Sequence, residues 1–391
     1  MTRPCRDIPA EATAPGPPTL QELLQREAQW LAPYAMPARK SRGRRYAEPE
    51  HPYRTPYQRD RDRITHSAAY RRLSYKTQVF TGEMGQLHRT RLTHTLEVAS
   101  IARTLGRALR LNEDLIEALA LVHDLGHPPF GHAGEQALQQ CLGEQGSFSH
   151  NQHALTLVEH LEHRYAEFPG LNLTWEVLQG QQAKVQPEQL ARGALLEVQV
   201  VDAADNIAYD THDADDALTL GLLGLEDLTQ LDLWHHAQAA VRRRWTIPDK
   251  RLFQRAVVRQ LIDTLVGDLL RTTWQNLRRH EVRSLEDVAR LKRLVCHSDE
   301  VAQQQQALER FLFQRVYRHP LLLRMRSRAC EMIRHCYEQL LARVEELGEV
   351  FCRRAQQHGP AQAVAEYLAC LTDEELLQLA QNPRSNPLPP R

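Results

Sequence analysis

Two segments that are expected to form buried helices carry polar side chains among their apolar ones. In residues 91–111, His94 lies on the same helical stripe as the apolar side chains that follow it at helical spacing. In residues 114–127, His123 continues the apolar stripe and Asp124 follows directly, before a glycine and a Pro-Pro pair end the helix. A buried carboxylate without a partner is costly. These side chains are therefore expected to share a binding partner.

A third expected helix, residues 195–217, places acidic side chains on the face that its valines and alanines define. Asp205 lies on that face, with Tyr209 one turn and Asp213 two turns further on. Two histidines and two aspartates on the inner sides of three helices can bind one divalent cation. Because this set contains imidazole and carboxylate but no thiolate, it suits Mn, Fe, Co, Ni or Mg better than a closed zinc site. The alternative is that each histidine is a hydrogen-bonded core residue, and periodicity alone does not decide between the two.

The elements that must position these residues are predicted to be helices throughout. From Ile64 to about Leu376 nearly every segment has helical periodicity, and strand-like alternation is almost absent. The sequence predicts an all-α protein, a helical bundle with additional C-terminal helices. Its expected parts are a disordered tail (1–18), an N-terminal helix with a basic arm (19–63), a catalytic core (64–220) and a C-terminal helical extension packed on that core (221–391).

The composition argues against several classes of protein. Lys plus Arg and Asp plus Glu number 49 each, so a dedicated nucleic-acid coat protein or membrane-surface binder is not expected. The sequence contains no apolar run that predicts a signal peptide or a membrane span, and its seven cysteines show no C-x-x-C pair. A cytoplasmic protein with reduced thiols is expected. The basic stretch 39–45 is either a solvated loop or subunit contact, or a site for single-stranded DNA or RNA.

The order of the candidate ligands, His94, then His123–Asp124, then Asp205, resembles the H…HD…D order of the HD superfamily of metal-dependent phosphohydrolases. Longer runs resemble the bacterial deoxyguanosine-triphosphate triphosphohydrolase family, in collinear order from about residue 20 to 373. These runs are RDRDRITHSAAYRRLSYKTQVF (59–80), RLTHTLEVA (91–99), HDLGHPPFGHAGE (123–135), FSHNQ (148–152), VVDAADNIAYDTHDADDA (200–217) and FLFQRVYRHP (311–320).

The resemblance implies an HD-domain fold and an enzyme that hydrolyses dGTP or another dNTP to a deoxynucleoside and inorganic triphosphate. It implies a divalent metal ion held by His94, His123, Asp124 and Asp205. A histidine that titrates near neutrality can protonate the departing 5′-oxygen, and a carboxylate behind it can fix its tautomer. The resemblance gives these roles to His132 and Glu135, with His127 and His150 as further active-site histidines.

The resemblance also implies how substrate and partners are bound. A triphosphate carries roughly four negative charges, so a cation and basic side chains are needed around it. The residues implied as phosphate contacts are Arg91 and Lys76, those lining the sugar are Tyr209 and Asp213, and the residue near sugar and base is Gln78. A homo-oligomer is expected, a hexamer from the family, with a second dNTP as an allosteric effector.

The sequence departs from the family at positions that leave the preferred base open. Asn206 replaces a common acidic residue, His153 a common glutamine, and residues 363–378 are only loosely similar to the family's closing segment. A 5′-deoxynucleotidase or a cyclic-nucleotide phosphodiesterase is the nearest alternative, but neither is expected to carry the PPFGHAGE run. A non-catalytic nucleotide sensor or nucleic-acid binder is the alternative from another class, and the complete set of ligand and catalytic residues argues against it.

Overall fold

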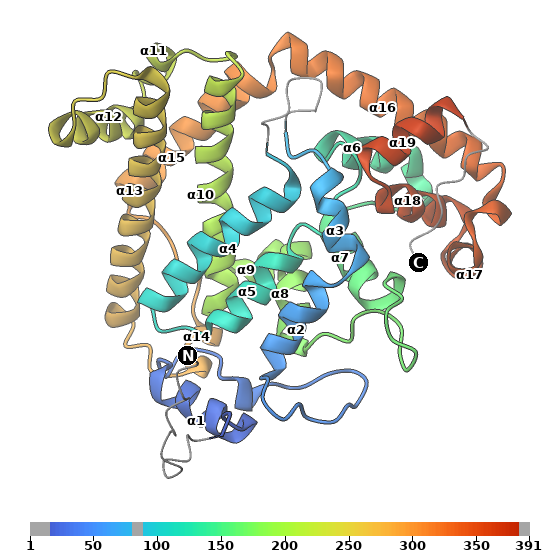
Figure 1. Cartoon of the computed structure of the whole chain (residues 1–391), viewed down its shortest axis with the longest axis horizontal. Helices are drawn as coiled ribbons and strands as arrows, with labels where there is room; N and C mark the ends of the chain where they lie inside the picture. Colours follow the sequence, from blue (N-terminus) through green and yellow to red (C-terminus); the bar gives the residue numbers. More distant parts are fainter. Residues whose placement is uncertain (1–15, 80–88, 383–391) are drawn as a thin grey trace, which may run out of the picture.

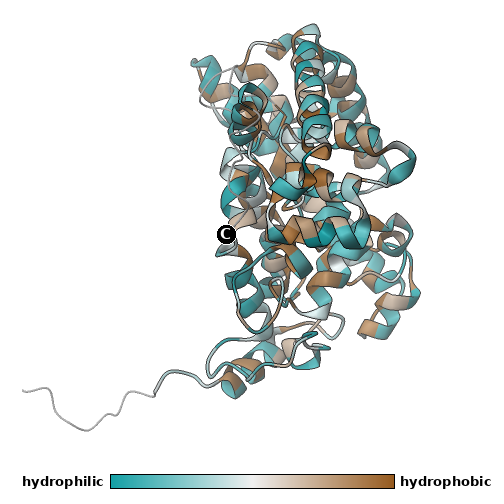
Figure 2. Ribbon diagram, turned by 90° about the vertical axis from the view of Figure 1, so that its right-hand side faces the viewer, coloured by the Kyte–Doolittle hydropathy of each residue, from teal (hydrophilic) through white to brown (hydrophobic). Residues whose placement is uncertain are grey.

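The computed structural model describes residues 16–79 and 89–382, and every regular element in these ranges is a helix (Figure 1). The prediction of an all-α fold is confirmed. Most of the expected tail 1–18 and the last nine residues of the expected C-terminal extension, 383–391, lie outside the described residues. No helix in the described ranges combines the length and apolarity that a membrane span requires. Along most helices hydrophilic and hydrophobic residues alternate (Figure 2), as one buried and one solvated face require.

Three helices form the centre of the molecule and pack on one another: α4 (Arg91–Ala108), α5 (Glu113–Val122) and α10 (Leu196–Thr219). Helix α4 begins at a capping box in which the Thr90 side chain accepts from the Thr93 amide, and α5 begins where Asn112 accepts from the Leu115 amide. Their inner faces are made of fully buried Val, Leu, Ile and Ala side chains. The polar residues singled out from the sequence therefore project from rigid, close-packed elements.

A short turn after α5 leads the chain into α6 (His132–Leu142), and we call residues 127–131 the histidine turn. Phe130 and Gly131 both have a positive φ, of 59° and 57°. A Cβ on Gly131 would lie 2.4 Å from Nη2 of Arg91, so this position requires glycine for space as well as for conformation. Helix α7 (His150–Thr156) lies against the end of α5, where a Cβ on Gly126 would lie 2.0 Å from the carbonyl oxygen of His150.

The N-terminal arm, residues 31–55, joins α1 (Leu20–Trp30) to α2 (Pro56–Thr65) and folds back on its own chain. Buried carboxylates from two core helices hold its main chain. Glu197 of α10 accepts from the Met36 amide at 2.8 Å, and Glu176 of α8 (Trp175–Val185) accepts from the Arg42 amide at 2.7 Å. The aromatic and basic side chains of the arm are therefore anchored on the core through its backbone.

The helices after α10 lie on two sides of the centre in the view of Figure 1. One group comprises α12 (Asp232–Arg244), α13 (Lys250–Arg279) and α15 (Asp299–Leu312), which pack beside α10. The other comprises α16 (Pro320–Leu341), α17 (Glu349–His358), α18 (Pro360–Cys370) and α19 (Asp373–Gln381). Of these, α16 and α18 pack on α6, while α17 packs on α18 and α19 on α16. Short helices complete the chain: α3 (Ala68–Arg72), α9 (Pro187–Ala191), α11 (Leu225–Leu228) and α14 (Leu285–Arg290).

We predict that Gly126→Ala destabilises the fold by about 1–3 kcal/mol, because the new methyl group would overlap the backbone of α7 at His150 and Ala154. The matched control is Gly267→Ala in the exposed interior of α13, where a Cβ meets nothing within 4 Å. Alanine there should stabilise the helix by about 0.5–1 kcal/mol. Urea unfolding of the three proteins measures both effects, and equal midpoints for Gly126→Ala and wild type would contradict the close approach.

Candidate active site

The four residues that the sequence suggested as metal ligands converge between α4, the end of α5 and α10. Nε2 of His94 lies 3.1 Å from Oδ1 of Asp205, and Nε2 of His123 lies 3.5 Å from an oxygen of Asp124 and from Oδ1 of Asp205. His94, His123 and Asp124 are buried and close enough together to hold one metal ion. The structure thus brings all four candidate residues to one point.

The donor atoms of this cluster fit a divalent cation. Nδ1 of His123 lies 2.6 Å from the carbonyl oxygen of Ala120, so Nδ1–H donates there and the lone pair of Nε2 faces the carboxylates. Nε2 of His123 is buried and has no hydrogen-bond partner among the described residues. An unpaired imidazole lone pair beside the buried carboxylate of Asp124 and the partly buried one of Asp205 is costly, and a bound cation would satisfy all three groups.

Each carboxylate of the cluster has one oxygen held by a basic side chain and the other turned toward the histidines. Nη1 of the buried Arg91 donates to Oδ2 of Asp124 at 3.0 Å, and Nζ of Lys184 in α8 donates to Oδ2 of Asp205 at 2.9 Å. Burial by itself would raise the pKa of Asp205, but the charge of Lys184 outweighs it and holds that pKa well below its usual range. Both carboxylates are therefore ionised and oriented before any ion binds.

Lys184 was not found from the sequence. It is a single lysine near the end of a polar helix, and its spacing relates it to no other candidate residue. Its partner Asp205 lies on a different helix, so only packing brings the two together.

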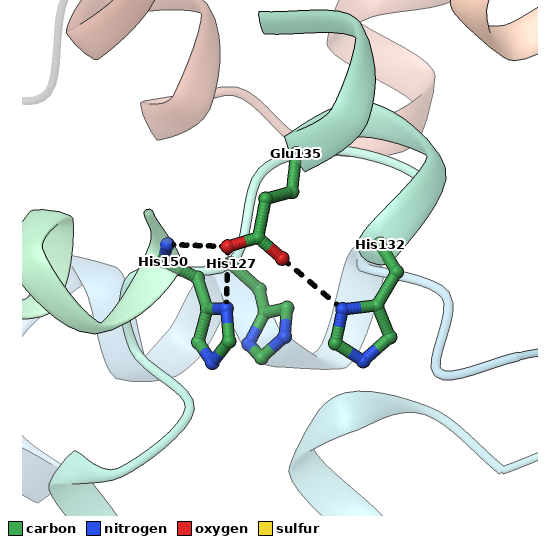
Figure 3. A group of neighbouring side chains, drawn as sticks. All are labelled: His127, His132, Glu135 and His150. Atoms are coloured by element: carbon green, nitrogen blue, oxygen red, sulfur yellow. Dashed lines mark hydrogen bonds and ion pairs between the residues drawn. The ribbon is translucent and has the colours of Figure 1, made fainter. Parts of the chain in front are cut away.

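A second group of side chains lies beside the cluster and contains the four residues that the sequence suggested for catalysis (Figure 3). Glu135 of α6 lies between two histidines: Oε2 is 3.1 Å from Nδ1 of His132, and Oε1 is 2.8 Å from Nδ1 of His150. The His150 amide also donates to Oε1 at 2.9 Å. Burial would raise the pKa of Glu135, but the hydrogen bonds from His132 and His150 outweigh it and leave this pKa below its usual range.

His127 joins the two groups. Its ring stacks on that of His150 with centroids 3.8 Å apart, and its Nδ1 lies 3.1 Å from Oδ1 of Asp124. Burial, with Arg91 nearby, lowers the pKa of His127 well below the usual value, so the ring is neutral. The imidazoles of α6 and α7 are thereby connected to the candidate metal ligands through one buried side chain.

The residues suggested for phosphate binding differ in their surroundings. Arg91 is buried and lies at the ligand cluster itself. Lys76 points elsewhere: its Nζ donates to the carbonyl oxygens of His127, at 2.7 Å, and Ala369, at 2.8 Å. Burial lowers the pKa of Lys76 to about 7. In this structure Lys76 therefore ties the histidine turn to α18, and contact with phosphate stays a prediction.

Two of the three residues suggested for the sugar and base border a cavity next to His132, and the third, Asp213, is buried. Tyr209 of α10 and Gln78 line the same small pocket as His132. Tyr209 also lines a neighbouring cavity of about 520 Å³, together with Tyr317 and other residues from α10 and the region around α15 and α16. Tyr317 donates to Asp213 and is a residue to which the sequence gave no role, although it lies in the run 311–320. Burial raises the pKa of Asp213 to about 7.

Comparison with known families agrees with this geometry. Residues 91–210 match the HD domain and residues 295–382 match the phosphohydrolase-associated domain. The HD-domain match spans all four candidate metal ligands and the four residues of the second group.

Curated relatives cover most of the chain and share the name deoxyguanosinetriphosphate triphosphohydrolase-like protein. One from Bordetella pertussis (strain Tohama I) is 44% identical over 359 residues, which are 88% of this chain and 93% of the relative. One from Thiobacillus denitrificans is 43% identical over 88% of this chain and 94% of its own length. One from Leptospira interrogans is 37% identical over 92% of this chain and 98% of its own length. The chain therefore belongs to the deoxyguanosinetriphosphate triphosphohydrolase-like family of HD-domain proteins.

Proposed function

We propose that the protein is a metal-dependent dNTP triphosphohydrolase, which converts dGTP or another dNTP plus water to a deoxynucleoside and inorganic triphosphate. The observation that carries the proposal is the contact chain from His132 through Glu135, His150 and His127 to Asp124. These contacts support a histidine–carboxylate pair acting as proton donor beside a cluster that fits a metal ion. The relatives' shared name supports the same reaction.

His94, His123, Asp124 and Asp205 would hold the ion, with Mn, Mg, Co, Ni and Fe all compatible with these donors. A divalent ion bound there supplies Lewis-acid polarisation of the α-phosphate. Arg91 and Lys184 fix the carboxylates so that their remaining oxygens face inward. Little reorganisation of the protein is then needed when the ion binds.

His132 is the group that we assign to the departing 5′-oxygen. Glu135 accepts from Nδ1 of His132, which leaves Nε2 as the outward-facing nitrogen that carries and donates the proton. The second oxygen of Glu135 is held by the His150 side chain and amide, so the carboxylate cannot rotate away. The neutral His127, which lies 3.1 Å from Asp124, and His150, which stacks on it, would lie on the phosphate side of the reacting bond.

The substrate would extend from the ligand cluster along α10. Arg91 would contact the phosphates, and Lys76 could join it only by releasing the two carbonyl groups that it binds here. Tyr209 and Asp213 would line the sugar, and Gln78, whose side-chain oxygen is buried without a hydrogen-bond partner among the described residues, would lie near sugar and base. A homo-oligomer and a second dNTP as effector belong to the same proposal, on the family resemblance alone.

Removal of two ligands should abolish metal binding. We predict that His123→Ala with Asp124→Ala lowers the bound divalent ion from one per chain to near zero, because an imidazole and a charged oxygen leave the cluster together. Elemental analysis of purified protein measures this, with Asp232→Ala plus His235→Ala on the exposed side of α12 as the matched control. An unchanged metal content in the first double variant would eliminate the site.

Loss of the proposed proton donor should affect turnover and not binding. His132→Ala is expected to lower kcat by about 10²–10⁴-fold, since the 5′-oxygen then departs without general-acid assistance. Metal content should remain at the wild-type value, because His132 is not one of the four residues proposed above to hold the ion. The exposed His236→Ala serves as control. If the kcat of His132→Ala lies within a few-fold of the wild-type value, His132 is not the proton donor.

Ribonucleotides should be poor substrates. Tyr209 lies one helical turn after Asp205, so its ring can pack on the sugar of a nucleotide whose phosphates lie at the cluster. We expect kcat/KM for dGTP to exceed that for GTP by roughly 100-fold, and we expect Tyr209→Ala to reduce the ratio. Release of inorganic triphosphate from the paired substrates measures it. Equal rates with dGTP and GTP in the wild-type enzyme would refute this placement of the sugar.

A further inference from the structure

The histidine turn has a backbone conformation that needs support. Phe130 has φ of 59° and Gly131 has φ of 57°, so two consecutive residues are left-handed. Glycine adopts this conformation freely, but for a bulky residue such as phenylalanine it is rare and costs free energy. The next residue is His132, the first of α6. The direction of the His132 side chain therefore depends on how well this turn is held.

The side chain of Asp373 holds the turn from the far end of the sequence. The Phe130 amide donates to Oδ1 of Asp373 at 2.9 Å. The Thr77 amide donates to Oδ2 at 3.0 Å, and the Thr77 hydroxyl donates to the same oxygen. All three partners are donors, and they use both oxygens of the carboxylate. Asp373 thus connects the strained turn to the segment that precedes Gln78.

Asp373 is itself fixed in place. It is the first residue of α19, where the preceding Thr372 caps the helix in a capping box with Glu375. Leu376 and Leu379 are buried, and α19 packs on α16. The N-terminus of a helix also favours a negative charge. The carboxylate is therefore presented by a rigid element and not by a free loop.

A second contact connects the same three parts of the chain. Nζ of Lys76 donates to the carbonyl oxygens of His127 and Ala369, at the start of the turn and near the end of α18. The carbonyl oxygen of Lys76 accepts from the amide of Arg91. Segment 76–78 thus lies between the C-terminal helices and the turn, and it also reaches the start of α4.

On the basis of the proposed function, in which His132 donates a proton, we infer that Asp373 is a positioning residue for the histidine turn. Its carboxylate holds the amide of Phe130 and so sets the entry of α6 and the place of the His132 imidazole. An amide side chain cannot replace it, because an NH₂ group would face either the Phe130 amide or the Thr77 amide. The segment 363–378, which resembles its family only loosely, would then contribute to catalysis without touching the substrate.

Asp373→Asn tests this inference. We expect kcat to fall by roughly 10- to 100-fold, because a small displacement of a proton donor has a large effect on rate. KM and metal content should stay within a few-fold of wild type, since the candidate ligands are not touched. The matched control is Glu374→Gln, an exposed acidic residue in the same first turn of α19, which should leave all three quantities unchanged.

Hydrogen exchange separates positioning from a general loss of stability. The amides of Thr77 and Phe130 should be protected in wild type and should exchange roughly five- to ten-fold faster in Asp373→Asn. Exchange within α4 and α10 should not change. Equal acceleration over the whole chain, or wild-type kcat in Asp373→Asn, would overturn the inference.

The hydrogen-exchange result does not depend on whether the protein catalyses the proposed reaction. Unprotected Thr77 and Phe130 amides in the wild-type protein would overturn the inference even if Asp373→Asn fails to fold. If no dNTP yields triphosphate, the proposed function fails, and with it the assignment of His132 as the group that is positioned. The contact between Asp373 and the turn is then still decided by exchange at the two amides.

Discussion

The structure depends on keeping two carboxylates ionised inside a close-packed helical core. Asp124 and Asp205 are each held through one oxygen by a basic side chain, Arg91 and Lys184, and each turns its other oxygen to a common centre. Leaving either carboxylate unpaired in this core would be costly, and these pairs remove that cost. The two pairs link α4 to the end of α5 and α8 to α10. A cation at the centre would then complete a set of charges that is already arranged.

Helical periodicity was sufficient to predict the fold class and to place His94 and Asp205 on the inner faces of α4 and α10. It did not decide whether these residues meet His123 and Asp124 at one metal site, and the family resemblance supplied that part of the prediction. The place of His132 next to Glu135 also follows from a three-residue spacing on a helix. The roles of these residues came from the family resemblance and not from spacing. Periodicity within one helix says nothing about pairs between helices, so Lys184 and Tyr317 were not found.

The contacts of Lys76 could not be predicted from the sequence for the same reason. Its charge and its place in the family's runs indicated a phosphate contact, yet in the structure it binds two carbonyl groups, one of them 293 residues away. The contact between Thr77 and Asp373 spans 296 residues. Contacts at such separation are decided by how the C-terminal helices pack on α6, and the sequence of either segment alone carries no signal of it.

Because these contacts join residues far apart in the sequence, they can form only late in the synthesis of the chain. A nascent chain that has emerged only through α16 already contains every candidate metal ligand and every imidazole of the site, but neither Ala369 nor Asp373. The histidine turn of such a chain lacks its two C-terminal contacts, and the core lacks the buried side chains of α18. Helices α18 and α19 must therefore be synthesised before the site can take the arrangement described here, and a chain that stops before them would lack both the support of the turn and part of the hydrophobic core.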